Sequence, residues 1–121
     1  MQSAAQAYRA VAKQVASPRD LEADLLLKAA SKLQAVQDSW ENSKPKLNDA
    51  LLYNRKLWTH FMATITEPKN PLPVEIRQNV ANLGLFTFQQ TFSLLANPRP
   101  EPLSSLIGIN RQLAAGLRGG A

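Results

Sequence analysis

The feature that most constrains the fold is the position of the prolines. All eight prolines of the 121-residue chain stand between segments in which apolar residues recur every three or four positions. They lie in SPRD, SKPK, EPKNPLP and NPRPEP. Proline inside a helix removes a backbone hydrogen bond and clashes with the preceding turn, so each of these sites separates two helices. Because alternating β-branched runs and Asn-Gly or Asp-Gly turns are also absent from the sequence, the pattern predicts an all-α chain.

The segments between the prolines predict five helices, at about residues 3–16, 17–42, 46–66, 73–96 and 101–117. Ser17 is suited to cap the second helix and Pro18 to fill its first position. Amphipathic helices joined by short loops pack antiparallel, so we expect one small helical bundle and a single domain over residues 1–121. The apolar stripe of residues 1–16 is thin, and we expect this segment and residues 117–121 to be more loosely held.

The segment at residues 73–96 has almost no charge, because Arg77 is the only ionised side chain between Ile76 and Arg99. On a helical wheel its apolar arc is about 200° wide, much wider than that of an ordinary surface helix. We therefore expect it to be the central helix of the bundle, with Gly84 permitting close approach of a neighbouring helix.

Two amides and one aromatic residue of this segment lie outside its apolar arc. Asn79, Asn82 and Phe86 form a candidate strip for binding a partner. The alternative is that Phe86 is covered by the preceding loop or by the N-terminal helix.

Three polar side chains fall inside apolar stripes: Asn54, Arg77 and Asn110. A buried charge without a partner is costly, so Arg77 needs an acceptor such as a helix-end carbonyl, an amide or a carboxylate. We expect a polar connection within the bundle. Such a connection either only specifies the fold or also takes part in binding.

The residue types argue against catalysis. The chain has no cysteine, which excludes a disulfide scaffold, thiolate metal ligands and a cysteine nucleophile. His60 is the single histidine, lies off the apolar stripe of its helix and has no second ligand at a suitable spacing. A Gly-rich phosphate loop is absent from the sequence. We predict that the protein is not an enzyme, with no catalytic residues, no metal site and no cofactor.

Charge and hydropathy indicate where the chain works. The net charge is +5, but the 14 basic residues are scattered, whereas nucleic-acid binding usually requires a basic stripe or patch. No uncharged apolar run approaches the roughly 20 residues that span a bilayer. Arg9 and Lys13 interrupt the apolar core that a signal peptide would need. We therefore expect a cytoplasmic protein without membrane insertion, and direct nucleic-acid binding is disfavoured.

Two segments resemble the FlaF family of alphaproteobacterial flagellar proteins. They are YNRKLWTHF at residues 53–61 and NPLPVEIRQNVANLGLF at residues 70–86. The Ala-rich N-terminal segment with its tyrosine also fits, so the resemblance covers nearly the whole chain. The motif residues that match are Asn54, Arg55, Trp58, Phe61, Asn70, Pro71, Pro73, Arg77 and Gly84.

The resemblance implies a factor of flagellum assembly that promotes flagellin production and secretion, together with the regulator FlbT. As a secretion chaperone it would bind the terminal helical segments of flagellin, which would lie as helices in an apolar groove. The partner-binding candidates are Tyr8, Val11, Val15, Asn79, Asn82 and Phe86. The alternatives are a post-transcriptional regulator acting with FlbT or on flagellin mRNA, and an adaptor that binds FlbT or flagellar export components.

Overall fold

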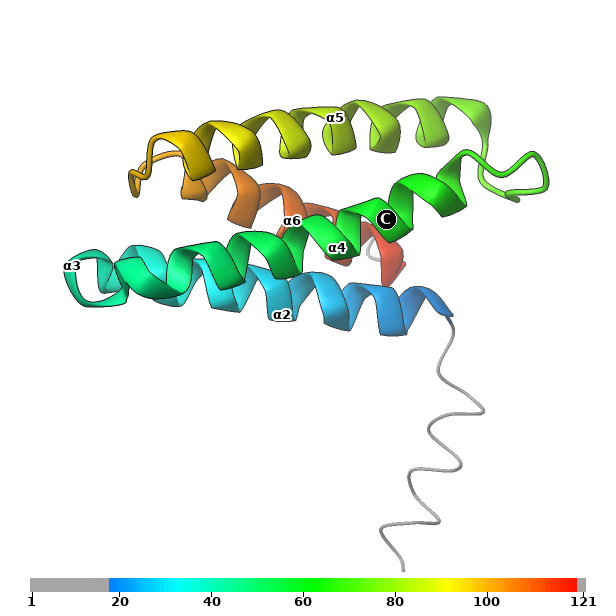
Figure 1. Ribbon diagram of the computed structural model, residues 1–121. Coiled ribbons are helices and arrows are strands. Elements are labelled where there is room, and N and C mark those ends of the chain that lie inside the picture. Colours follow the sequence, from blue (N-terminus) through cyan, green and yellow to red (C-terminus); the bar gives the residue numbers. More distant parts are fainter. Residues whose placement is uncertain (1–17, 120–121) are drawn as a thin grey trace, which may run out of the picture.

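A computed structural model describes residues 18–119, which form helices and loops with no strand among them (Figure 1). The elements are α2 (Pro18–Asp38), α3 (Trp40–Ser43), the 3₁₀ turn η1 (Lys44–Lys46), α4 (Leu47–Ile65), α5 (Val74–Ala96) and α6 (Leu103–Leu117). The predicted all-α bundle is confirmed, as are the four helices predicted after residue 16. The helix predicted at residues 3–16 lies outside the described residues.

The prolines set the helix boundaries as predicted, with one difference. Pro73 and Pro102 directly precede α5 and α6. The second helix was predicted to continue to about residue 42, but Ser39 leaves helical geometry with φ −124° and ψ 46°. The Ser39 carbonyl then accepts hydrogen bonds from the amides of Asn42 and Ser43, at 2.9 and 2.8 Å. The chain turns here, and α3 connects α2 to α4 (Figure 1).

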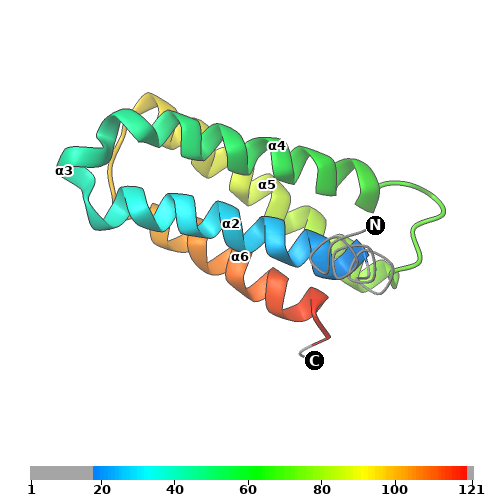
Figure 2. The same cartoon turned by 90° about the horizontal axis from the view of Figure 1, so that it is seen from below.

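The prediction that residues 73–96 form the central helix was wrong. In the bundle α2 packs against both α4 and α6, whereas α5 packs mainly on α4 and touches α6 only slightly. Figure 2 shows α2 and α6 side by side, and Figure 1 shows α4 between α2 and α5. Among the described helices, α2 therefore has the most extensive packing contacts.

The amino acids on the two sides of α5 explain its place. Its buried residues are small or of medium size: Val80, Gly84, Thr87, Thr91 and Leu94. Its large apolar residues that point to solvent are Val74, Ile76, Leu85, Phe86 and Phe92. A wide apolar arc indicates contact with apolar groups, but not whether those groups belong to the same chain.

Gly84 is where the Met62 side chain of α4 packs against the backbone of α5. A Cβ atom added there would overlap with the thioether sulfur of Met62 on α4. The missing side chain thus permits close packing of the two helices, and this holds the exposed part of α5 beside α4.

Two apolar clusters make up the core. The first, near the α2–α4 connection, includes Leu33, Leu51 and Leu106. The second, toward the beginning of α2 and the end of α4, includes Leu26, Trp58 and Phe61. Asn54 and Asn110 are fully buried where the two clusters meet.

Candidate functional site

The buried amides form a polar connection across three helices. Asn110 Nδ2 donates to Asn54 Oδ1 at 2.7 Å and, at 3.4 Å, to the Leu26 carbonyl of α2. The indole Nε1 of Trp58 donates to Asn110 Oδ1 at 2.9 Å. Buried polar groups need such partners, so the connection sets how α4 and α6 align in the bundle.

Arg77 does not belong to that connection. Its side chain is half-buried, and its Nε donates to the Leu72 carbonyl in the α4–α5 loop at 3.1 Å. The acceptor is a loop carbonyl just before the helix that carries Arg77. The role that the structure gives this residue is to hold the loop against the first turn of α5.

Asn70 holds the other side of the same loop. Its Nδ2 donates to the Thr64 carbonyl at 3.0 Å, and its Oδ1 accepts from the Leu72 amide at 2.9 Å. Because Asn70 and Arg77 hold the loop on both sides, Pro71 and Leu72 keep their place over the end of the bundle.

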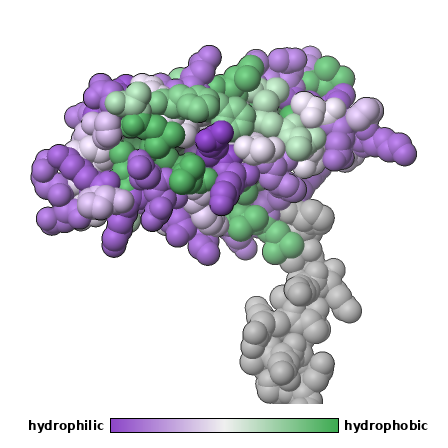
Figure 3. All heavy atoms as spheres, viewed as in Figure 1, coloured by the Kyte–Doolittle hydropathy of each residue, from purple (hydrophilic) through white to green (hydrophobic). Residues whose placement is uncertain are grey.

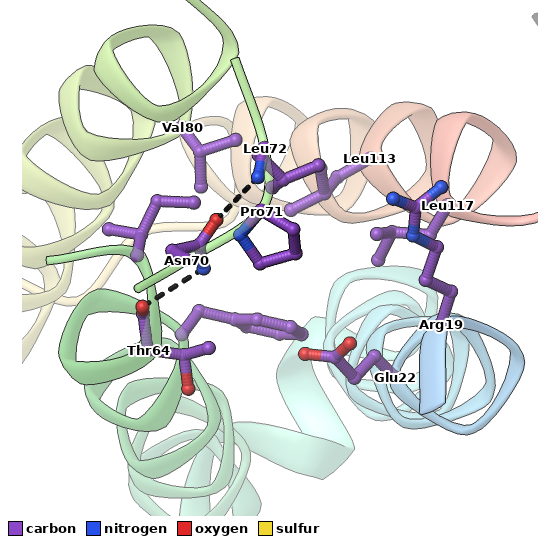
Figure 4. Close-up of a pocket in the computed structure, with 11 residues that line it drawn as sticks. Arg19, Glu22, Thr64, Asn70, Pro71, Leu72, Val80, Leu113 and Leu117 are labelled. Atoms are coloured by element: carbon purple, nitrogen blue, oxygen red, sulfur yellow. Dashed lines mark hydrogen bonds between the residues drawn. The ribbon is translucent and has the colours of Figure 1, made fainter. Parts of the chain in front are cut away.

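An apolar pocket of about 360 Å³ lies under this loop (Figure 4). It is where the beginning of α2, the end of α4, the loop, α5 and the end of α6 meet. The residues that line it are Arg19, Glu22, Phe61, Thr64, Ile65, Asn70, Pro71, Leu72, Val80, Leu113 and Leu117. Its size lies at the lower end of the range for ligand pockets, and its walls are mostly apolar. We call it the end pocket.

Glu22 is the acidic residue of the end pocket. Burial raises the pKa of the Glu22 carboxyl above its ordinary value, while electrostatic interaction with His60 and Arg19 acts in the opposite direction. His60 itself is exposed on α4. Within residues 18–119, no three His, Cys, Asp or Glu residues gather as a metal site would require.

A second apolar surface runs along α5, which we call the α5 face. It consists of Val74, Ala81, Leu85, Phe88 and Phe92. Steps of seven, four, three and four residues place these side chains along one side of a helix. Leu85 and Phe92 are 55% and 57% exposed, whereas Ala81 and Phe88 are half-buried.

One edge of the α5 face borders α4. The Arg55 guanidinium lies over the ring of Phe92, 5.4 Å from the ring centroid, and Leu52 is exposed nearby on α4. Figure 3 shows hydrophobic and strongly hydrophilic residues together on the side of the molecule where α4 and α5 lie. Large exposed apolar side chains beside charged ones are typical of a protein-binding site.

The structure describes three of the six residues that were predicted to bind a partner. Asn79, Asn82 and Phe86 are exposed together on the outer side of α5, and Phe86 is 36% exposed. Asn82 Oδ1 accepts a hydrogen bond from Gln78 Nε2 at 3.1 Å. The other three candidates, Tyr8, Val11 and Val15, lie outside the described residues.

Sequence reasoning missed the residues of the α5 face because it assigned the apolar side of residues 73–96 to the core. The signal that could have identified them is the combination of heptad-like spacing with an absence of charge from Gln78 to Ala96. Sequence reasoning also missed the end pocket, although its motif residues Phe61, Asn70 and Pro71 had been singled out.

The comparisons with known proteins identify the family. Residues 4–117 match the family described as "Flagellar protein FlaF". No curated protein and no solved structure matches the chain significantly. In residues 18–119, no helix is both long enough and apolar enough to cross a membrane. Because the match covers far more than half of its length, the chain belongs to the FlaF family of flagellar proteins.

Proposed function

We propose that the protein is a flagellin-binding secretion chaperone, which works in the cytoplasm and covers the terminal helical segments of flagellin before export. Membership of the FlaF family of flagellar proteins supports a role in the flagellum. The observation that carries the molecular role is the α5 face. It presents Val74, Leu85 and Phe92 to solvent near the beginning, in the middle and near the end of the helix, as a surface for another helix does.

The dimensions of the α5 face fit one amphipathic helix. From Val74 to Phe92 the helix rises about 27 Å, which is five turns of an α-helix. A partner helix lying along α5 would place its apolar residues between Leu85 and Phe92 and would reach α4 at Leu52. Covering such residues removes apolar area from water, which favours binding and keeps the same segment of flagellin from aggregating.

The border of the α5 face contributes selectivity. Arg55 stands over Phe92 and Lys56 is exposed beside it on α4, whereas α5 carries no acidic residue after Glu75. A partner helix with acidic residues beside its apolar stripe would therefore be preferred over a basic one.

The test is calorimetric titration of the full chain with purified monomeric flagellin from the same bacterium. Replacing Leu85→Asp and Phe92→Asp together should weaken binding by at least about tenfold, because both side chains would carry charge into the interface. The matched control is Leu21→Asp with Leu25→Asp, two exposed leucines on α2, and this variant should bind as the unaltered chain does.

Circular dichroism establishes that both double variants remain helical. Equal affinity of the two variants for flagellin would contradict the proposed site. If flagellin does not bind the unaltered chain while FlbT does, the chaperone role is wrong and the protein is an adaptor.

A further inference from the structure

The end pocket lies where the chain enters the bundle. Arg19 and Glu22, on the first two turns of α2, are part of its wall, and Pro18 is the first residue of that helix. Figure 4 shows both side chains on one side of the pocket, with Pro71 of the α4–α5 loop close by. The residues that precede Pro18 are therefore joined to the rim of the pocket.

The sequence at this junction favours a change of direction. A residue before proline is disfavoured in the α-helical region, so a helix cannot easily continue through Ser17 into α2. The 17 residues before Pro18 then need not extend the axis of α2. A turn at Ser17 would let these residues reach the pocket.

The chemistry of the segment matches the pocket. Tyr8, Val11 and Val15 are three and four residues apart, which places them on one side of a helix over a length of about 10 Å. The pocket offers apolar walls to such a stripe, with Leu72, Leu113 and Leu117 half-buried at its opening.

Charge makes a smaller contribution to the match. Residues 1–17 contain Arg9 and Lys13 and no acidic residue, whereas Glu22 is the acidic side chain of the pocket. The Glu22 carboxylate offers a partner to one of these basic side chains, but Arg19 of the same wall already acts on that carboxyl, so the match between segment and pocket is mainly apolar. A tethered segment is also present at an effective concentration of the order of millimolar, so even a weak contact fills the site.

We propose that the end pocket is the docking site of the chain's own residues 1–17, with Val11 and Val15 against its apolar walls and one basic side chain beside Glu22. The assignment concerns a site separate from the α5 face and does not depend on the flagellin role. A partner that reached this pocket would have to displace the segment first.

Disulfide trapping tests the proposal directly, because the full chain has no cysteine of its own. Val11→Cys is combined with Leu72→Cys, and Val15→Cys with Leu117→Cys, so that each pair joins the segment to the pocket. The control pair is Val11→Cys with Leu52→Cys, since Leu52 is exposed on α4 and does not line the pocket. A disulfide needs Cα atoms within about 7 Å, so it reports docking rather than general proximity.

At least one pocket pair should form an intrachain disulfide about tenfold faster than the control pair, because docking raises the local concentration of the two thiols. Peptide mass spectrometry distinguishes intrachain from interchain bonds. Equal rates for the pocket and control pairs would overturn the proposal and leave the pocket to a segment of another protein. Disulfides formed only between chains would also overturn it, because the segment of a second copy would then be the occupant.

A second readout does not need cysteine. In the full chain, Val11→Asp with Val15→Asp should uncover the pocket and increase the fluorescence of the apolar dye anilinonaphthalene sulfonate. The control, Gln6→Asp with Ala10→Asp, changes the opposite side of the predicted helix and should leave the fluorescence unchanged. An equal change in both variants would contradict docking through Val11 and Val15.

Discussion

At the scale of single residues, the polar side chains inside the apolar stripes define the interior. The sequence indicated that Asn54 and Asn110 would be connected within the bundle, and the structure joins them at 2.7 Å. The sequence could not show that Trp58 donates to the same amide, because an indole in an apolar stripe looks like ordinary core. It also grouped Arg77 with these amides, although Arg77 bonds to a loop carbonyl.

Asn110→Leu should reduce the free energy of unfolding by about 2 kcal/mol or more, because the Asn54 oxygen and the Trp58 indole N–H would lose their partner in the core. Urea denaturation followed by tryptophan fluorescence measures this change. The surface control Asn79→Leu should stay within about 0.5 kcal/mol of the unaltered chain.

Combining Asn54→Leu with Asn110→Leu should cost less than the sum of the two single changes, because both remove the same hydrogen bond. Strictly additive losses would show that the two amides do not interact, and would contradict their assignment as one polar connection.

At the scale of elements, the sequence could predict the limits of α5 but not its position in the bundle. Its existence and its limits followed from Pro73 and the NPRPEP segment, since proline restricts where a helix can begin and end. Its position did not follow, because an apolar side chain has the same preference for a neighbouring helix and for another protein. Gly84, Thr87 and Thr91 are buried, so the side of α5 that packs into the bundle is the one with small side chains.

Gly84→Leu should lower the free energy of unfolding by about 1–3 kcal/mol, because the new side chain would take the space of the Met62 side chain and force it out of its packing. Gly116→Leu on α6 is the matched control. It has open space around it and should be neutral or stabilising, since leucine favours a helix more than glycine does.

The stability lost in Gly84→Leu should be partly recoverable by a second substitution. Adding Met62→Ala to Gly84→Leu should restore part of the lost stability, because it removes the side chain that the leucine would meet. Thermal denaturation of the three variants compares them. If Gly84→Leu were as stable as Gly116→Leu, close approach of the two helices at Gly84 would not be a constraint.

At the scale of the whole molecule, the described helices differ in how far their neighbours cover their apolar residues. Helix α2 lies between α4 and α6 and shares the core with both, whereas α5 lies on α4 and keeps its apolar face toward solvent. The bundle class could be predicted from the proline positions and from the apolar periodicity. The end pocket required the packing of all helices, because residues far apart in the sequence form it. The exposure of the α5 face depended on which side of α5 its neighbours leave uncovered.

The central claim is that flagellin binds along the α5 face. The most direct measurement is hydrogen–deuterium exchange of the full chain, followed by mass spectrometry, with and without purified monomeric flagellin. Binding should slow amide exchange in α5 and in the part of α4 near Arg55 far more than in α2, because a docked helix suppresses local opening of the elements it covers. Unchanged exchange in α5 with flagellin bound, or protection confined to other helices, would contradict the claim.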